Sequence, residues 1–447
     1  MSDLLDVADA VVGLAQDDEQ VEAYVARSTD TSVRVYGGGV EQLSVADSMG
    51  VGVRVVTHGR QGFAYCGSFD RQAVAETVAD ARDNAAFAEP DEHAGVAEPD
   101  GVEPASLDLW RDDLVTVPTD RKVALAIELE RAILASDPRL VGVESSDYAD
   151  TLEESAVVTT TGIRRTSRAT GCDVVAYPLA AEGDEMQSGF GFSVGRTVDD
   201  LDVEAAARDA VDRALRMLGA SQPPSGRLTV VLDPWVTAQL VGLVAGTLAA
   251  DEVIKGRSLF ADRVGEQVAA PAVTLVEDPT DDRSWGATAI DDEGLATRRV
   301  PLIVDGALAG FAHSTWTARR MGAASTGSAL RAGFKATPAV GCRAVSLAPG
   351  TGDTASLVSG VGDGVLVQEV SGLHSGVNPV SGDLSTGAQG LRIRGGELAE
   401  PLREFTIAST VQRLLRDVTA VGADLTWLPM SAAGLTLVVR DVSVSGA

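Results

Sequence analysis

The stretch Ser32-Val-Arg-Val-Tyr-Gly-Gly-Gly-Val-Glu-Gln-Leu-Ser-Val45 alternates apolar and polar residues on either side of three glycines. An alternation of period two places the apolar side chains on one face of a β-strand, and consecutive glycines supply the backbone conformations of a tight turn. The stretch Val51-Gly-Val-Arg-Val-Val-Thr-His-Gly-Arg-Gln-Gly-Phe-Ala-Tyr65 repeats the device. Together the two stretches predict a β-meander of about four strands.

Helical periodicity lies on both sides of this meander. Apolar residues recur near every third or fourth position over 3–27, 70–88 and 119–136, and each range is predicted to form a helix. Residues 89–118 carry proline, glycine and acidic residues without periodicity, so they are predicted to form an irregular excursion over the first domain. Helices and antiparallel strands that follow one another in this way predict an α+β fold, with an N-terminal α/β-meander domain.

A chain of 447 residues exceeds what one compact core usually organises, so two domains are expected. Ser221-Gln-Pro-Pro-Ser-Gly226 is the best linker, which places the boundary between an N-terminal domain over 1–220 and a C-terminal domain over 221–447. The second half contains many short strands between glycine turns, including one expected at 287–290. This pattern predicts a β-rich domain, built as an antiparallel sheet or a partial barrel.

Charge and cysteine usage limit the classes of partner. The chain has 36 basic and 65 acidic residues and a formal net charge of −29, so its field repels phosphate backbones and disfavours direct nucleic-acid binding. Cys66, Cys172 and Cys342 are widely spaced, which is typical of reduced thiols. The acidic start, Met1-Ser-Asp-Leu-Leu-Asp6, is not a signal peptide. We therefore expect a cytoplasmic protein without a membrane segment.

One apolar helix is conspicuous. Asp233-Pro-Trp is a helix start, and from there to Ala250 the chain has no ionisable side chain. The run is shorter than the roughly 20 apolar residues that a membrane span requires. It is predicted to be a buried core helix.

The sequence contains few local motifs that indicate a catalytic or metal-binding site. The four histidines, His58, His93, His313 and His374, are too far apart for two of them to share a helical turn, so they form no local metal motif. Two glycine-supported segments are less easily dismissed: 316–331, which ends at Arg331, and 372–383. Polar side chains on such loops serve either a structural or a functional role, and the residues alone leave both alternatives open.

Several motifs, in this order and spacing, resemble the TldD/PmbA family, which is also described as TldD/TldE metalloproteases and as modulators of DNA gyrase. The motifs lie at 50–62, 255–260, 263–266, 277–279, 318–327, 372–383 and 421–424. The resemblance covers nearly the whole chain. It implies an α+β N-terminal domain, a β-rich C-terminal domain, and dimers that enclose a cavity.

The resemblance also separates two branches of the family. The TldD branch carries His-Glu-x-x-x-His on the helix before a Gly-Arg-Ser-like turn, together with a late cysteine ligand. Counting back from Gly256, this chain has Val241 and Gly246 at the histidine positions and Gly242 at the glutamate position. Residues 424–430 offer no cysteine. The resemblance is therefore to the PmbA/TldE branch, which implies no zinc and no catalytic residue in this chain.

The function that this resemblance implies is that of a subunit in a TldD/TldE metallopeptidase that degrades small or unfolded peptides. A TldD-like partner is expected to supply the zinc, in a heterodimer, although a homodimer is also considered. The isolated chain is expected to be inactive. It would form one wall of the substrate cavity, and Arg331, His374, Asn378 and Asp383 are the candidate substrate-binding residues.

Two alternatives belong to other classes of function. The first is a homodimeric peptide-binding or scaffold protein without chemistry of its own. The second is an autonomous metallopeptidase with dispersed ligands such as His313 and His374. It ranks last, because neither histidine has a companion ligand at a useful spacing.

Overall fold

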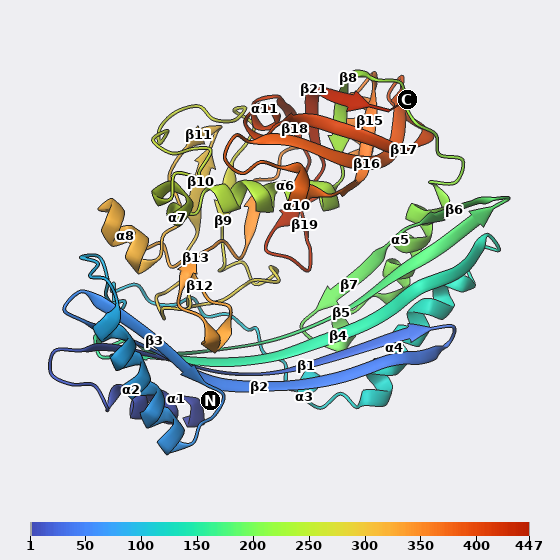
Figure 1. Ribbon diagram of the computed structural model, residues 1–447. Helices are drawn as coiled ribbons and strands as arrows, with labels where there is room; N and C mark the ends of the chain where they lie inside the picture. The colour runs from blue at the N-terminus through green and yellow to red at the C-terminus, as the bar shows by residue number, and fades with distance from the viewer. Residues whose placement is uncertain (1, 447) are drawn as a thin grey trace.

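The computed structural model describes residues 2–446, without the side chains of Ser2 and His374. A long, curved sheet forms the first lobe, and a β-rich second lobe lies over one face of that sheet (Figure 1). The order of the strands in the sheet is β3-β2-β1-β4-β5-β6, and β7 also pairs with β5. The strands are β1 (Gln20–Tyr36), β2 (Gly39–Thr57), β3 (Arg60–Cys66), β4 (Leu140–Thr159), β5 (Arg164–Glu182), β6 (Glu185–Ser188) and β7 (Gly191–Gly195).

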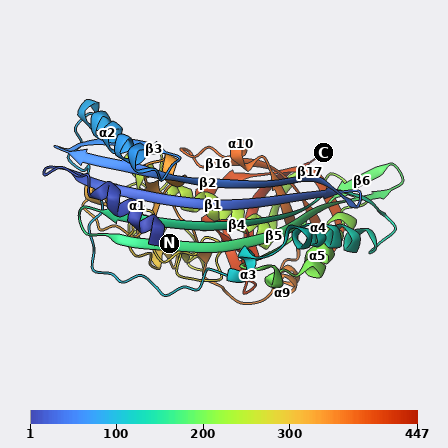
Figure 2. The same ribbon diagram turned by 90° about the horizontal axis from the view of Figure 1, so that it is seen from below.

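Helices pack on two ends of this sheet, each pair over an apolar core of its own (Figure 2). They are α1 (Ser2–Val12) and α2 (Arg71–Phe87) at one end, and α4 (Thr119–Leu134) and α5 (Val203–Leu215) at the other. The helices predicted at 70–88 and 119–136 are confirmed within two residues at each end, as α2 and α4. At the start of α2 the side chain of Asp70 accepts hydrogen bonds from the amides of Gln72 and Ala73.

The alternating stretch forms the predicted hairpin. Val33 and Val35 are buried against α4 while Ser32 and Arg34 are exposed, and the left-handed backbone of the intervening glycines makes the turn. The strands are longer than predicted, however. Residues 40–45 and 51–56, expected as two strands, belong to the single strand β2.

The helix predicted at 3–27 is wrong beyond Val12, because β1 begins at Gln20. Val21, Ala23 and Val25 are fully buried on the helix side of the sheet, and the residues between them face the second lobe. A strand that is covered on both faces loses the clean alternation of apolar and polar residues, and its pattern is easily mistaken for a helix.

The second lobe is built around a closed barrel. Its strands follow the order β17-β16-β15-β8-β21, and β17 also pairs with β21, which closes the ring; β18 pairs on the outside with β21. The pair β8–β15 is parallel. The partial barrel that the sequence predicts is therefore fully closed. The strands are β8 (Gly226–Leu232), β15 (Asp363–Ser371), β16 (Asp383–Arg394), β17 (Glu397–Thr410), β18 (Val418–Val421) and β21 (Leu437–Ser445).

A smaller sheet, in the order β11-β10-β9-β14, lies next to the barrel. Its strands are β9 (Leu275–Glu277), β10 (Val300–Val304), β11 (Ala307–Leu308) and β14 (Val345–Leu347). The strand expected at 287–290 is wrong: in the described chain this range makes only a single bridge, from Ile290 to Ala296. The carboxylate of Asp291 instead holds a turn by accepting from the amides of Glu293 and Leu295.

The apolar run forms helix α6 (Pro234–Thr247), with Asp233 as its cap, and then α7 (Ala250–Ile254). Val236, Val241 and Val244 are buried in the main core of the second lobe, as predicted. One side of α6 is nevertheless open. A Cβ atom added at Gly242 would meet only Ala432, at 3.9 Å, and one added at Gly246 would meet nothing within 4 Å.

Short elements complete the chain. They are α3 (Asp112–Val115), α8 (Thr315–Met321), α9 (Thr354–Ser359), α10 (Leu373–Gly376), α11 (Val411–Arg416), β12 (Ala329–Leu330), β13 (Ala339–Val340), β19 (Thr426–Trp427), β20 (Ala433–Gly434) and two 3₁₀ turns, Val198–Asp200 and Gly333–Lys335. Apart from α3, residues 89–118 contain no helix or strand. None of the helices in residues 2–446 is long and apolar enough to cross a membrane.

Candidate functional site

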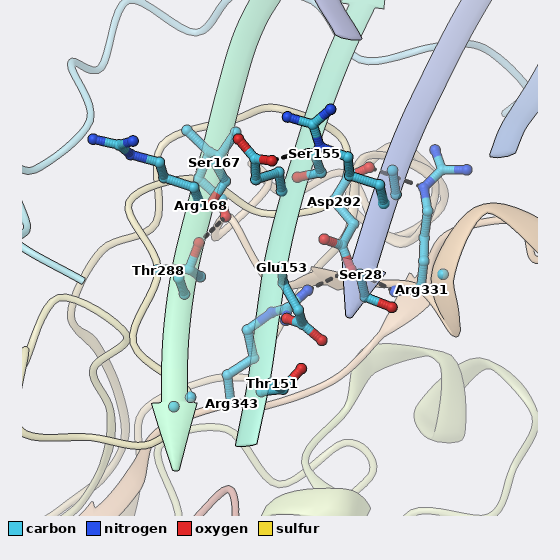
Figure 3. A pocket seen from close by; sticks show the side chains of 18 of the residues that line it. Ser28, Thr151, Glu153, Ser155, Ser167, Arg168, Thr288, Asp292, Arg331 and Arg343 are labelled. Atoms are coloured by element: carbon cyan, nitrogen blue, oxygen red, sulfur yellow. Dashed lines mark hydrogen bonds and ion pairs between the residues drawn. The ribbon is translucent and has the colours of Figure 1, made fainter. Parts of the chain in front are cut away.

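A cavity of about 560 Å³ lies between the two lobes. Its floor is the face of the first sheet that is turned toward the second lobe, and its roof consists of second-lobe loops at 285–292 and 331–335 together with Arg343 (Figure 3). Polar loops and a sheet face that belong to different lobes are a common setting for a ligand site.

The floor is open because its side chains are small. Ser28 of β1 and Ala169 of β5 lie directly opposite Glu153 of β4, and Ser155 pairs with Ser167 one step further along. Directly opposed residues of antiparallel strands share a face, so these small groups form one continuous patch under the roof. The hydroxyl groups can donate to and accept from a polar ligand without filling the space.

A buried ionic cluster ties the floor to the roof. Glu22 of β1 and Arg54 of β2 form an ion pair, with Arg54 Nη2 2.6 Å from Glu22 Oε2. Arg331 and Glu293 of the second lobe join it: Arg331 donates to Glu22, and Arg54 Nη2 lies 3.2 Å from Glu293 Oε1. Burial alone would raise the pKa of Glu22, but the charges of Arg331 and Arg54 outweigh burial and lower it.

The roof is held in place by two carboxylates. Glu277 accepts from the backbone amides of Arg343 and Ala344, at 2.8 Å and 3.1 Å, and its burial raises its pKa to about 7. Asp292 accepts from the guanidinium of Arg343 and, at 2.6 Å, from the backbone amide of Arg331. The positive side chain of Arg343 is therefore both fixed and neutralised at the cavity wall.

Glu153 differs from these carboxylates. No other described residue forms a hydrogen bond or an ion pair with it. Burial raises the pKa of Glu153, the charge of Asp30 raises it further, and the charge of Arg343 acts in the opposite direction. Figure 3 shows Glu153 between the floor strands and Arg343.

The candidate residues from the sequence are placed in two different regions. Arg331 lines the cavity, but its guanidinium is turned to Glu22 and stacks on the ring of Tyr24, with its Cζ 5.0 Å from the ring centroid. Asn378 accepts from the amides of Val380 and Ser381 in a local turn and is not among the residues that line the cavity.

Asp383 also belongs to the turn at 372–383, where it accepts from the hydroxyl of Ser381 at 2.7 Å, away from the cavity lining. The side chain of His374 lies outside the described part of the chain. A substrate-binding role for these residues stays a prediction.

The sequence reasoning missed Glu22, Arg54, Glu153 and Arg343. Arg54 carried a signal, because a single arginine inside the valine-rich run 51–56 must find a buried carboxylate or disrupt the strand. Glu22 lay in the range mistaken for a helix, so its position on the cavity side of a strand was hidden. Nothing in the local pattern distinguishes Glu153 or Arg343.

The residues at the zinc-helix positions do not fit a zinc ion. Val241 points into a small apolar hollow of about 40 Å³ and carries no donor atom, while Gly242 and Gly246 have no side chain. Among the described side chains, no three His, Cys, Asp or Glu residues are grouped so that they could hold a metal. His313 is buried and its Nδ1 has no described partner, but it belongs to no group of three possible metal ligands among the described residues.

Comparisons with known proteins cover almost the whole chain. Models of the PmbA/TldA metallopeptidase family match residues 21–85 (domain 1), 112–218 (central domain) and 225–446 (C-terminal domain). The metalloprotease PmbA of Escherichia coli O157:H7 is 27% identical over 407 residues, which span 90% of this chain and 87% of that protein. A metalloprotease of Methanothermobacter thermautotrophicus is 27% identical over 443 residues, which span 94% of this chain and 90% of that protein.

Solved structures agree with this fold. A protein from Thermotoga maritima described as a modulator of DNA gyrase has a TM-score of 0.91 at 24% identity, over 98% of this chain and 99% of that one. TldE from Thermococcus kodakarensis has a TM-score of 0.88 at 23% identity and covers 100% of both chains. The family models and the full-length relatives together lead to one statement: this chain belongs to the PmbA/TldA metallopeptidase family.

Proposed function

We propose that this chain is the PmbA/TldE-like subunit of a TldD/TldE-type metallopeptidase that acts in the cytoplasm on small or unfolded peptides. The observation that carries the proposal is helix α6, where Val241, Gly242 and Gly246 occupy the zinc-motif positions without a single ligand atom. Relatives named metalloproteases support proteolysis as the reaction. The three cysteines, all unpaired in the structure, are in keeping with a reducing compartment.

The division of labour follows from zinc chemistry. Peptide hydrolysis at zinc needs three protein ligands and a base that takes a proton from the metal-bound water. Since α6 supplies none of these, a TldD-like partner would have to supply them all. The contribution of this chain is then the cavity between its two lobes, which holds the substrate close to the partner's metal.

An extended peptide has two ways to bind at such a surface. Its backbone can pair with a free strand edge, and its side chains can enter pockets on the adjoining face. Among the described strands, the first half of β2, residues 39–50, pairs with β1 alone, because β3 pairs with β2 from Val51 onward. This edge adjoins the floor of the cavity at Ser48.

The proposal is tested by co-expression of the chain with a family paralogue from the same genome that carries His-Glu-x-x-x-His. The expected complex is a heterodimer that contains one zinc ion, measured by metal analysis, and cleaves an unfolded peptide. Replacement of the partner's motif glutamate by glutamine should abolish cleavage and leave the heterodimer intact. Stoichiometric zinc and peptide cleavage by the purified chain alone would contradict the proposal.

The same preparation tests the alternative function. A chain that self-associates, binds peptides and gains no cleavage activity with any such paralogue would be a non-catalytic, homodimeric peptide-binding protein. Light scattering and the cleavage assay distinguish the two outcomes.

A further inference from the structure

Each charged side chain that lines the cavity, except Glu153, has an ion-pair, hydrogen-bond or aromatic-ring partner among the described residues. Five of them are in ion pairs: Arg27 with Glu154, Arg343 with Asp292, and Arg331 with Glu22, which lies outside the lining. Arg168 and Lys335 stack on aromatic rings, and Arg196 donates to the carbonyl oxygens of Thr170 and Ser284. Asp291 accepts from the backbone amides of Leu295 and Ala329. For Glu153 the described residues supply no partner.

The surroundings of Glu153 favour a positive ligand. After burial, the charge of Asp30 on the neighbouring strand β1 has the largest effect on the pKa of Glu153 and raises it, so the two carboxylates form a local excess of negative charge. The charge of Arg343 on the roof is already taken up by Asp292. Glu153 has no counter-ion among the described residues and its side chain is accessible from the cavity, so a cationic group that enters the cavity can pair with it.

The floor also leaves room for such a group. Ser28 and Ala169 flank Glu153 in the register, and Asp30 follows on the same face of β1. Thr151 donates to Asp30 at 2.8 Å, which holds that carboxylate at the floor without neutralising it. An ammonium group has three N–H donors and can bridge two carboxylates and a neighbouring hydroxyl.

We propose that Glu153 and Asp30 form a subsite that binds a cationic group of the substrate peptide, so that basic peptides are the preferred substrate class. The inference rests on the proposed function, because it takes the cavity to be the peptide site. The ammonium comes either from a lysine side chain or from the peptide's N-terminus. The net charge of −29 attracts such peptides toward the cavity over longer distances.

Calorimetric titration of the full chain with three short peptides tests this. The peptides are acetylated and amidated and differ at one central residue, which is lysine, glutamine or glutamate. The lysine peptide is expected to bind about tenfold more tightly than the other two, as a charge pair in a partly enclosed site implies. An unacetylated glutamine peptide that binds as tightly as the lysine peptide would identify the N-terminal ammonium as a second source of the charge.

Two variants and one control test whether the preference for the lysine peptide arises at the subsite. Glu153→Gln keeps the shape and should reduce binding of the lysine peptide to that of the glutamine peptide, whereas Glu41→Gln, on the exposed end of β2, should change nothing. Ala169→Lys places an internal cation directly opposite Glu153 and should abolish the preference as well. Thermal melts check that each variant is folded.

Three outcomes would overturn the inference: equal affinity for the three peptides, an unchanged preference in Glu153→Gln, or no binding of any peptide. The proposed function is judged separately by cleavage in the complex with the TldD-like partner. A complex that cleaves all three peptides equally well refutes the basic subsite and leaves the peptidase role standing. A complex that cleaves no peptide refutes the proposed function.

Discussion

Arg331 donates a hydrogen bond to Glu22 in the interior between the two lobes, although the two residues are 309 positions apart in the sequence. Both side chains are only 1% exposed. The backbone amide of Arg331 also donates to Asp292, which in turn holds Arg343 at the cavity roof. The pair therefore fixes the height of the roof above the floor and, with it, the shape of the cavity.

Removal of one charge from this cluster should be strongly destabilising. Glu22→Gln leaves the buried Arg331 without its carboxylate partner and Arg54 with Glu293 alone, and the free energy of unfolding should fall by about 3 to 5 kcal/mol. Denaturant unfolding followed by circular dichroism measures it. Arg34→Gln, which breaks an exposed pair with Asp147, is the matched control and should have little effect because solvent screens that pair. Equal effects of the two variants would show that the cluster is hydrated.

Helix α6 gives a second prediction about the core. Val241 is 5% exposed and borders an apolar hollow, so Val241→Glu should lower the free energy of unfolding by several kcal/mol, on the order of 3 to 5, as an unpaired buried charge does. Val264→Glu, at a residue that is 57% exposed, is the control. A stability of Val241→Glu within error of the native chain would show that this side of α6 opens to solvent.

A third prediction concerns pH. Burial and the charges of Asp147 and Asp150 raise the pKa of Asp173 from 3.8 to about 6. Between these values the folded state holds a proton that the unfolded state has lost, so this residue's contribution to stability declines as the pH rises from about 4 to 6. Asp173→Asn cannot lose a proton. Its stability should equal that of the native chain near pH 4 and exceed it above pH 6 by on the order of 2 kcal/mol.

Chemical unfolding of both proteins at a series of pH values measures this difference. Asp199→Asn, on the exposed 3₁₀ turn Val198–Asp200, provides the control and should give no pH-dependent difference. A constant difference between Asp173→Asn and the native chain across pH 4 to 7 would mean that Asp173 is ionised throughout that range.

The sequence was sufficient for features that depend on neighbouring residues. The hairpin around Gly37–Gly39, helix α2 behind Asp70 and the buried face of α6 all follow from local periodicity and capping. It was insufficient wherever both faces of an element are covered. The strand from Gln20 reads as a helix because one face packs on helices and the other meets the second lobe.

The candidate site could be predicted even less well, because its contacts join residues that lie far apart in the sequence. Arg331 was selected from its loop, but its partner Glu22 lies in the other lobe, and no pattern within either segment connects them. Glu153 and Arg343 face each other only because two lobes meet (Figure 3). The resemblance to a family carries the long-range information about fold and reaction class, and within the described residues the geometry leaves Glu153 without a partner.

The motif at 50–62 has a physical explanation in the contact between the lobes. Gly50 and Gly52 of β2 lie against Phe334 of the second lobe: a Cβ atom at Gly52 would come within 2.4 Å of the carbonyl oxygen of Phe334, and one at Gly50 within 2.3 Å of its ring. Backbone atoms cannot move aside as a flexible side chain can. Glycine at position 52 is therefore required for the second lobe to close on the sheet.

Gly52→Ala should consequently force the lobes apart and lower the free energy of unfolding by about 1 to 3 kcal/mol, the usual cost of an overpacked contact. Gly142→Ala, in β4 of the same sheet, is the matched control, because a Cβ atom there meets nothing within 4 Å. Denaturant unfolding compares the two variants. Because Tyr65 packs on Phe334 with ring centroids 6.3 Å apart, the near-ultraviolet circular dichroism of Gly52→Ala should also change. Equal stability and an unchanged aromatic spectrum in both variants would show that the second lobe can shift at Phe334 without cost.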